Sequence, residues 1–160
     1  MELTFAPRGH LQIDDARIIF RNFEGRGDQY NREGERNFAV IIPTQEMAGA
    51  LADAGWNVTI RAPREPGEEP FMFLKVKVNY YDNFGPVAYL NSAGNVRKLD
   101  EESIGILDKI ELARVDMDIR PHDWNYAGRS GRTARLDKIH VIQELDRFAA
   151  RYAEGDPLPF

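Results

Sequence analysis

Residues 71–80 are the segment in which residue type and spacing most clearly suggest chemistry. Alternate side chains of a strand point to opposite faces, and here the even positions form an apolar set for a core: Met72, Leu74, Val76, Val78 and Tyr80. The odd positions begin with Phe71 and Phe73 and continue with Lys75 and Lys77. Aromatic rings stack on bases for about 1–3 kcal/mol each, and ammonium groups meet phosphates, so this face suits a nucleic-acid strand. Alternatively, the two rings lie under the loop at 63–70 and the lysines are solvated.

A polar, glycine-rich stretch at 24–36 interleaves an aromatic residue with arginines. Its members of these types are Arg26, Tyr30, Arg32 and Arg36, and the strand before it carries Arg17, Arg21 and Phe23. Arginine neutralises phosphate and also stacks on bases, so we expect these residues to contribute to the same surface. Acidic residues in the stretch balance most of its charge, so a solvated loop is the alternative.

A second polar stretch, which we expect to be a loop at 121–131, again mixes aromatic and basic residues. The candidates for binding here are Trp124, Tyr126, Arg129, Arg132 and Arg135. Large aromatic residues exposed on a loop are unusual unless they contact something. Trp124 can instead fold back onto the core, as large aromatic residues usually do.

The C-terminal tip is acidic and rich in proline, and it ends in an aromatic residue. We expect its members to bind a partner protein: Glu154, Asp156, Leu158, Pro159 and Phe160. A terminal ring can fill a partner's pocket while the carboxylates meet basic side chains. A frayed terminus is the alternative.

Composition limits the class of protein. The chain has 160 residues, a net charge of −5 and no cysteine, which excludes disulfides, thiolate metal sites and a cysteine nucleophile. No signal peptide or membrane-spanning run is visible, so we expect a cytoplasmic protein. An acidic average argues against nucleic acid, but acidic residues gather at 99–112 and basic residues at 120–138, and the distribution matters more than the sum.

Short β-type runs dominate the chain, with turn signals between them. We expect strands at 17–23, 37–42, 56–62, 71–80, 87–90, 113–120 and 132–142. A helix is expected at 45–54 after Thr44 as N-cap, with a short one near Asp100 and a tail at 143–153 that can be helical. This pattern predicts a mainly β fold, a small barrel or sandwich, with one domain at 1–142 and a tail at 143–160.

The tip and the first polar stretch together resemble a known family. Leu158-Pro159-Phe160 matches the end of single-stranded DNA-binding proteins, and residues 21–25, 30–34 and 36–38 are similar to small phage proteins of that group with an OB fold. The resemblance implies an OB-type five-stranded barrel with inserted hairpins and one or two short helices. It also implies a non-catalytic protein without cofactor or metal, which binds and protects single-stranded DNA with little sequence preference during phage replication or recombination. Its tail would recruit replication or recombination proteins, and a homodimer is expected in many members.

Two other functions remain open at this stage. A phage protein-binding module or inhibitor would act through the acidic segment at 100–111, without nucleic acid. A nuclease would hold Mg²⁺ at Asp116 and Asp118, with His122 and Asp123 nearby. Failure to bind oligonucleotides at low salt would favour the first, and Mg²⁺-dependent cleavage would favour the second.

Overall fold

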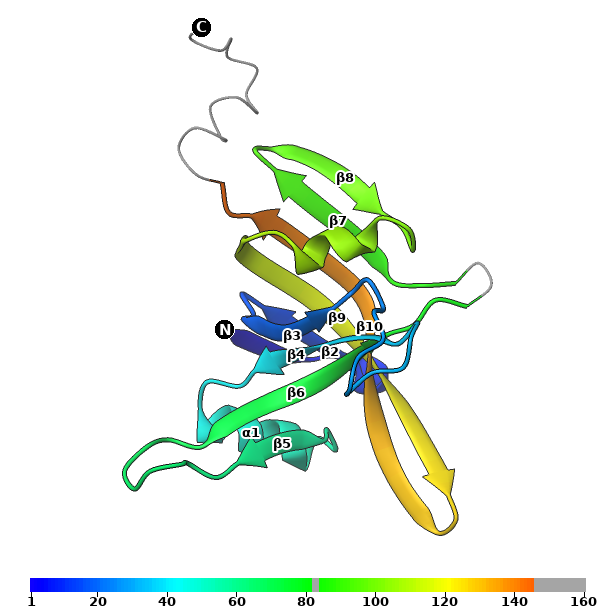
Figure 1. The fold of residues 1–160 in the computed structure, drawn as a ribbon. Helices are drawn as coiled ribbons and strands as arrows, with labels where there is room; N and C mark the ends of the chain where they lie inside the picture. The colour runs from blue at the N-terminus through cyan, green and yellow to red at the C-terminus, as the bar shows by residue number, and fades with distance from the viewer. Residues whose placement is uncertain (82–83, 146–160) are drawn as a thin grey trace, which may run out of the picture.

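The computed structural model describes residues 1–81 and 84–145, which form a mainly β protein (Figure 1). Ten strands belong to one sheet. In chain order they are β1 (Glu2–Phe5), β2 (Leu11–Asp14), β3 (Ile18–Asn22), β4 (Arg36–Ile41), β5 (Val58–Arg61), β6 (Phe71–Val78), β7 (Val87–Ser92), β8 (Asn95–Leu99), β9 (Leu112–Tyr126) and β10 (Arg129–Gln143). The helical elements of the described residues are the 3₁₀ turns η1 (Pro7–Gly9) and η2 (Ile104–Asp108) and the helix α1 (Gln45–Asp53).

The strands do not close into the five-stranded OB-type barrel that the sequence led us to expect. Their path is β1-β2-β9-β10-β6-β4-β3, with β5 added beside β6 and the β7–β8 hairpin added beside β10. In the described residues β1 and β3 end this path without pairing to each other, so the sheet is open. Strand β10 joins the parts, because it pairs antiparallel with β9 and parallel with both β6 and β7.

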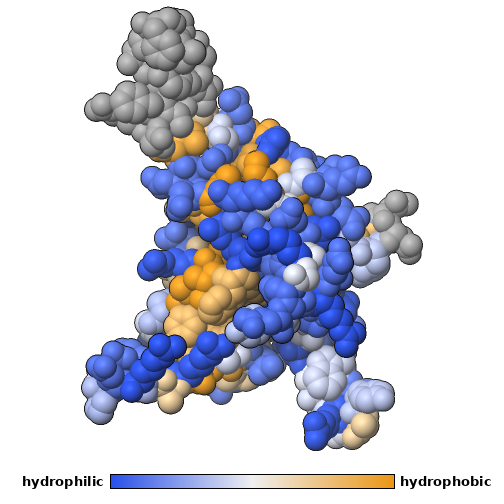
Figure 2. Space-filling model, in the orientation of Figure 1, coloured by the Kyte–Doolittle hydropathy of each residue, from blue (hydrophilic) through white to orange (hydrophobic). Residues whose placement is uncertain are grey.

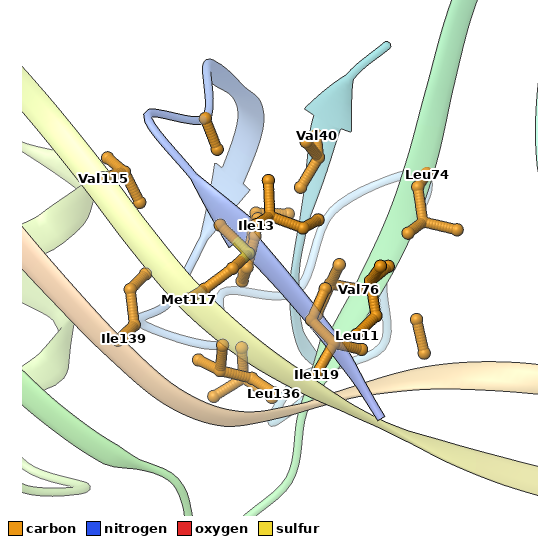
Figure 3. Close-up of a cluster of buried hydrophobic side chains, with 14 of the residues drawn as sticks. Leu11, Ile13, Val40, Leu74, Val76, Val115, Met117, Ile119, Leu136 and Ile139 are labelled. Atoms are coloured by element: carbon orange, nitrogen blue, oxygen red, sulfur yellow. The ribbon is translucent and has the colours of Figure 1, made fainter. Parts of the chain in front are cut away.

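The core lies against one face of these strands. Figure 3 shows aliphatic side chains from β2, β4, β6, β9 and β10 converging on one another. The labelled members are all buried: Leu11, Ile13, Val40, Leu74, Val76, Val115, Met117, Ile119, Leu136 and Ile139. Strands β6 and β9 supply five of these side chains, which confirms the apolar face predicted at 71–80 and shows the same pattern in β9.

Helix α1 begins and ends as the sequence indicates. The Thr44 hydroxyl accepts a hydrogen bond from the Met47 N–H at 3.1 Å, which satisfies one of the free donors at the helix start. Leu51 is fully buried, and Gly55 follows the helix with φ +95°. The second helix was predicted near Asp100, but the only helical structure there is the 3₁₀ turn at η2, three residues after Glu101.

The stretch at 121–131 is not the loop that we expected. Strands β9 and β10 are each 15 residues long, and their pairing continues to Tyr126 and Arg129. The outer part of this hairpin projects away from the sheet as a two-stranded arm (yellow and orange in Figure 1). We call residues 121–132 the arm. Neither face of the arm packs into the core, so its sequence has no alternation of apolar and polar residues. Proline, histidine and aromatic residues occupy it instead, and they gave the appearance of a loop.

The end of β10 also differs from the prediction. The strand runs to Gln143, and Glu144 N–H donates to the Glu111 carbonyl at 2.8 Å, so no helix starts at 143. The rest of the predicted tail lies outside the described residues from 146 onward. Within the described part of the chain, no helix is long and apolar enough to cross a membrane.

Candidate nucleic-acid interface

Three phenylalanine rings meet on the face of the sheet opposite the core. Phe71 and Phe73 of β6 have ring centroids 5.5 Å apart. The Phe20 ring of β3 contacts both edge to face, at 6.5 Å from Phe71 and 5.9 Å from Phe73. We call these residues the phenylalanine cluster. Phe73 is 8% exposed whereas Phe20 is 59% exposed, so Phe20 is the ring that the cluster presents to solvent.

Phe20 reaches this position through an irregularity in β3. The pairing of β3 with β4 shifts between Ile19 and Asn22, and Phe20 adopts φ +53°. Aromatic side chains rarely occupy this left-handed region, and a residue held there costs of order 1–3 kcal/mol. Phe20 was not among the predicted site residues, because the pattern at 17–23 gives no sign of the bulge.

Cationic side chains border the cluster. The Arg61 guanidinium lies 5.2 Å from the centre of the Phe73 ring, and Lys75 is exposed on the same face of β6. An open groove of about 600 Å³ runs past them and reaches the loop at 24–36, where Arg26 and Tyr30 line it. Figure 2 shows the apolar patch over β3, β4 and β6, bordered by hydrophilic residues. Arg61 was also absent from the predicted site, although it lies at the end of a predicted strand.

The loop at 24–36 is held in place by side-chain hydrogen bonds. The buried Asn22 amide donates to the carbonyls of Arg26 and Glu35, and its oxygen accepts from the N–H groups of Gly25 and Arg26. Asp28 accepts from the N–H groups of Tyr30 and Asn31, which lowers the pKa of its carboxyl. The groove wall that carries Arg26 and Tyr30 is therefore built before any ligand arrives.

Three residues of the predicted site make contacts within the fold. Phe23 is fully buried and stacks on Phe38, with centroids 5.0 Å apart, so it belongs to the core and not to a binding surface. Arg21 donates to the carbonyls of Leu107 and Ile110 at 2.7 and 2.8 Å.

Arg36 is also engaged from inside. It donates to the Phe23 carbonyl and lies 5.4 Å from the centre of the Tyr80 ring. Burial raises the pKa of Tyr80 to about 12.

The remaining predicted residues of this region are exposed but differently placed. Arg32 is exposed and is not among the residues that line the groove. Arg17 lines another hollow, together with Met1, Glu111 and Arg114, so the structure does not bring it to the groove.

The arm presents a second set of predicted residues. Trp124 is 42% exposed and Tyr126 is 80% exposed, and Arg129 is exposed beside them. Trp124 does not fold into the core; it lies over Gly131, its cross-strand neighbour, where an added Cβ would come within 2.5 Å of the ring. Arg132 instead supports the arm, because it donates to Asp123 at 2.7 Å and to the Ala54 carbonyl at 2.8 Å and lies over Trp56. Arg135 is half-buried at the arm's root.

Of the acidic residues considered as metal ligands, Asp116 already has partners within the fold. Asp116 accepts from the Asp15 N–H and from Arg114, and although burial acts to raise the pKa of this carboxyl, these contacts lower it overall. Among residues 1–81 and 84–145, no group of three acidic or histidine side chains is placed to hold a metal ion.

The segment at 100–111 likewise uses two of its acids internally. The Asp108 carboxylate accepts from the N–H groups of Phe23 and Glu24, and the Asp100 carboxylate accepts from those of Glu102 and Ser103. These carboxylates shape the fold more than they form an acidic binding surface.

An open β-sheet with clustered aromatic rings, bordering cations and an arm carrying further aromatic residues defines the class of proteins that hold nucleic-acid strands on a sheet surface. The family model of the phage ssDNA-binding domain matches residues 2–158, and the chain belongs to this family.

Solved structures with a similar fold come from bacteriophage Enc34. Its single-stranded DNA-binding protein in complex with ssDNA is 12% identical, with a TM-score of 0.57 over 91% of this chain and 93% of that one. The same protein with a C-terminal truncation is 11% identical, with a TM-score of 0.56 over 90% and 91%. A third structure of that protein is 11% identical, with a TM-score of 0.55 over 98% and 100%. At these identities the likeness concerns the fold alone. Among curated proteins, nothing matches the chain.

Proposed function

We propose that this protein binds and protects single-stranded DNA, with little sequence preference, during phage replication or recombination. The observation that carries the proposal is the phenylalanine cluster in an open groove with Arg61 and Lys75 beside it. Membership of the phage ssDNA-binding domain family supports it. The protein is a binding protein without catalysis, cofactor or metal, and it acts in the cytoplasm of the host cell.

Bases would stack on Phe20 and on the exposed parts of Phe71. Stacking depends on the flat π-face that every base has, so it selects single strands without reading sequence. Phosphates would meet Arg26, Arg61 and Lys75 along the groove, and the Tyr30 ring lines the same wall as Arg26. A duplex cannot offer its bases in this way without being unstacked.

The arm would provide a second contact surface. Trp124 and Tyr126 offer two more rings, and Arg129 offers a charge at the turn. Since the arm extends beyond the sheet, it would lengthen the strand that one molecule holds.

The C-terminal tip would recruit replication or recombination proteins through Phe160 and its neighbouring acids, Glu154 and Asp156. It lies outside the described residues, so this part of the proposal rests on the sequence. Removing residues 154–160 should abolish partner binding and tighten DNA binding, because two carboxylates that compete with phosphates would be lost. Pairing of two copies as a homodimer is part of the same proposal, and light scattering of the full chain measures it.

The proposal is tested by fluorescence anisotropy with a labelled oligo-dT, at low and moderate salt, beside a duplex of equal length. We expect tight binding to the single strand alone. The binding constant K should fall as salt rises, and each phosphate contact should add about −0.7 to the slope of log K against log salt. No binding to the single strand at either salt would overturn the proposal and favour a protein-binding role.

A further inference from the structure

Three basic side chains lie in one row across the centre of the sheet. The strand register places Lys77 of β6 beside Arg135 of β10, and Arg135 beside Arg120 of β9. Residues in register on neighbouring strands point to the same face, and in an antiparallel pair such as Arg135 and Arg120 their Cβ atoms lie about 4.5–5.5 Å apart. We call Lys77, Arg135 and Arg120 the basic row.

The basic row lies on the same face as the phenylalanine cluster. Lys77 follows Phe73 and Lys75 at alternate positions of β6, while the neighbours Val76 and Ala134 are buried on the core side. The row therefore continues from the groove, across β10, to the strand that leads into the arm. It connects the two surfaces that carry exposed aromatic residues.

No described residue neutralises this row by an ion pair. In the described part of the chain, no carboxylate lies within 4.0 Å of any of its three cations, as every ion pair there involves other residues. Among residues 1–81 and 84–145, the buried Nε atoms of Arg120 and Arg135 have no acceptor, and the one hydrogen bond that the Arg120 side chain donates goes to the neutral Tyr81 hydroxyl, at 3.2 Å. Like charges directly opposite on paired strands are destabilising, so the row weakens the fold unless an anion joins it.

We propose that the basic row is a binding site for backbone phosphates of single-stranded DNA, with Arg135 at its centre. A phosphodiester fits because guanidinium groups recognise its oxygens through paired N–H donors. Arg120 was not among the predicted site residues. Its position beside Arg135 indicates the path of the DNA backbone, which would run from the phenylalanine cluster, across β6, β10 and β9, to the arm. This inference rests on the proposed function and specifies where the backbone crosses the sheet.

The test compares Arg135→Gln with the wild-type protein on an oligo-dT of the length that one molecule covers, over a series of salt concentrations. Loss of one phosphate contact lowers the slope of log K against log salt by about 0.7, which is roughly a fivefold loss of affinity at 0.1 M salt. Arg120→Gln should behave in the same way, and Arg135→Lys should keep most of the slope because it keeps the charge. Lys98→Gln, which removes an exposed charge on β8, is the control and should leave the slope unchanged.

Thermal unfolding separates this role from a structural one. Removing one charge of an unneutralised row should leave the melting temperature of Arg135→Gln equal to or above that of the wild type. A wild-type slope in Arg135→Gln would overturn the inference while leaving single-strand binding intact, and so would a slope loss of the same size in Lys98→Gln. Failure of the wild-type protein to bind any single strand would instead overturn the proposed function itself.

Discussion

Phe20 and Phe73 meet edge to face with ring centroids 5.9 Å apart, although β4 lies between their strands. Ala39 of β4 lines the groove between them. Its methyl group leaves room for the two rings to approach across the sheet. The contact therefore depends on a bulge in β3, a small residue in β4 and an aromatic residue in β6.

Replacing Phe20 should weaken DNA binding without weakening the fold. Phe20→Ala removes an exposed ring. We therefore expect the free energy of binding to oligo-dT to weaken by about 1–3 kcal/mol, which is the usual contribution of one stacked base. The melting temperature should change little, because most of the ring is solvated and the strained backbone at φ +53° is relieved slightly by a smaller side chain. Phe5→Ala on β1, also an exposed ring, is the matched control. Equal losses of affinity in the two variants would refute a specific role for Phe20.

Phe73 and Lys75 should separate stability from binding. Phe73 is almost fully buried, so Phe73→Ala should lower the free energy of unfolding by about 3–5 kcal/mol. Lys75→Ala should keep stability and reduce the salt slope by about 0.7, since it removes one exposed charge at the groove. Urea unfolding and anisotropy titrations of each variant measure the two effects. Unchanged affinity and slope in Lys75→Ala would place the phosphate path elsewhere.

Gly131 should control the position of the Trp124 ring. A Cβ at this position would come within 2.5 Å of the ring, so Gly131→Ala must displace Trp124 from its cross-strand neighbour. In a Trp56→Phe background, so that Trp124 alone is observed, its emission should shift to longer wavelength and oligo-dT affinity should fall. Gly49→Ala in α1, where nothing lies within 4 Å, is the control and should stabilise the helix by about 0.5–1 kcal/mol. An unchanged emission spectrum in Gly131→Ala would contradict the packing described for the arm.

The contribution of Asp123 to stability should disappear in acid. The hydrogen bond from Arg132 holds the pKa of the Asp123 carboxyl below its usual value. Such a carboxyl stabilises the fold when the pH is above its pKa in the unfolded chain, which is near 4. The stabilisation is lost as the pH falls through the lower pKa that the carboxyl has in the folded protein.

Asp123→Asn should therefore melt at a slightly lower temperature than wild type at pH 7, and the difference should shrink as the pH falls below about 4 and vanish in strong acid. Asp118→Asn is the control on the same strand, since Asp118 makes no ion pair within 4.0 Å in the described residues. A difference between wild type and Asp123→Asn that persists in strong acid would assign the effect to something other than this carboxylate.

Local patterns in the sequence predicted the local structure well. Thr44 marked the start of α1, and the alternation around Leu74 and Val76 identified the buried face of β6. These features depend on neighbours within a few residues, which the sequence displays directly. Membership of the phage ssDNA-binding domain family confirmed the resemblance that the tip and the first polar stretch indicated.

Features that depend on distant segments could not be read in the same way. The open sheet depends on the parallel pairing of β10 with β6 and β7, from which β10 is separated by other strands in the chain, and no local pattern encodes this pairing. Phe20 enters the groove through a bulge against β4, while Phe23, read as a surface residue, is buried on Phe38. The row that contains Arg120 exists only through the register of β6, β10 and β9.

The left-handed backbone at Phe20 has a consequence for the time course of binding. The free protein already holds this ring exposed at the mouth of the groove, so capture of a strand requires no rearrangement of β3. The association rate is then determined by the attraction between the protein's cations and the DNA phosphates. Stacking on Phe20 instead determines the dissociation rate of the DNA strand. Strand and protein should therefore associate in a single kinetic phase, and loss of the ring should appear in the dissociation rate alone.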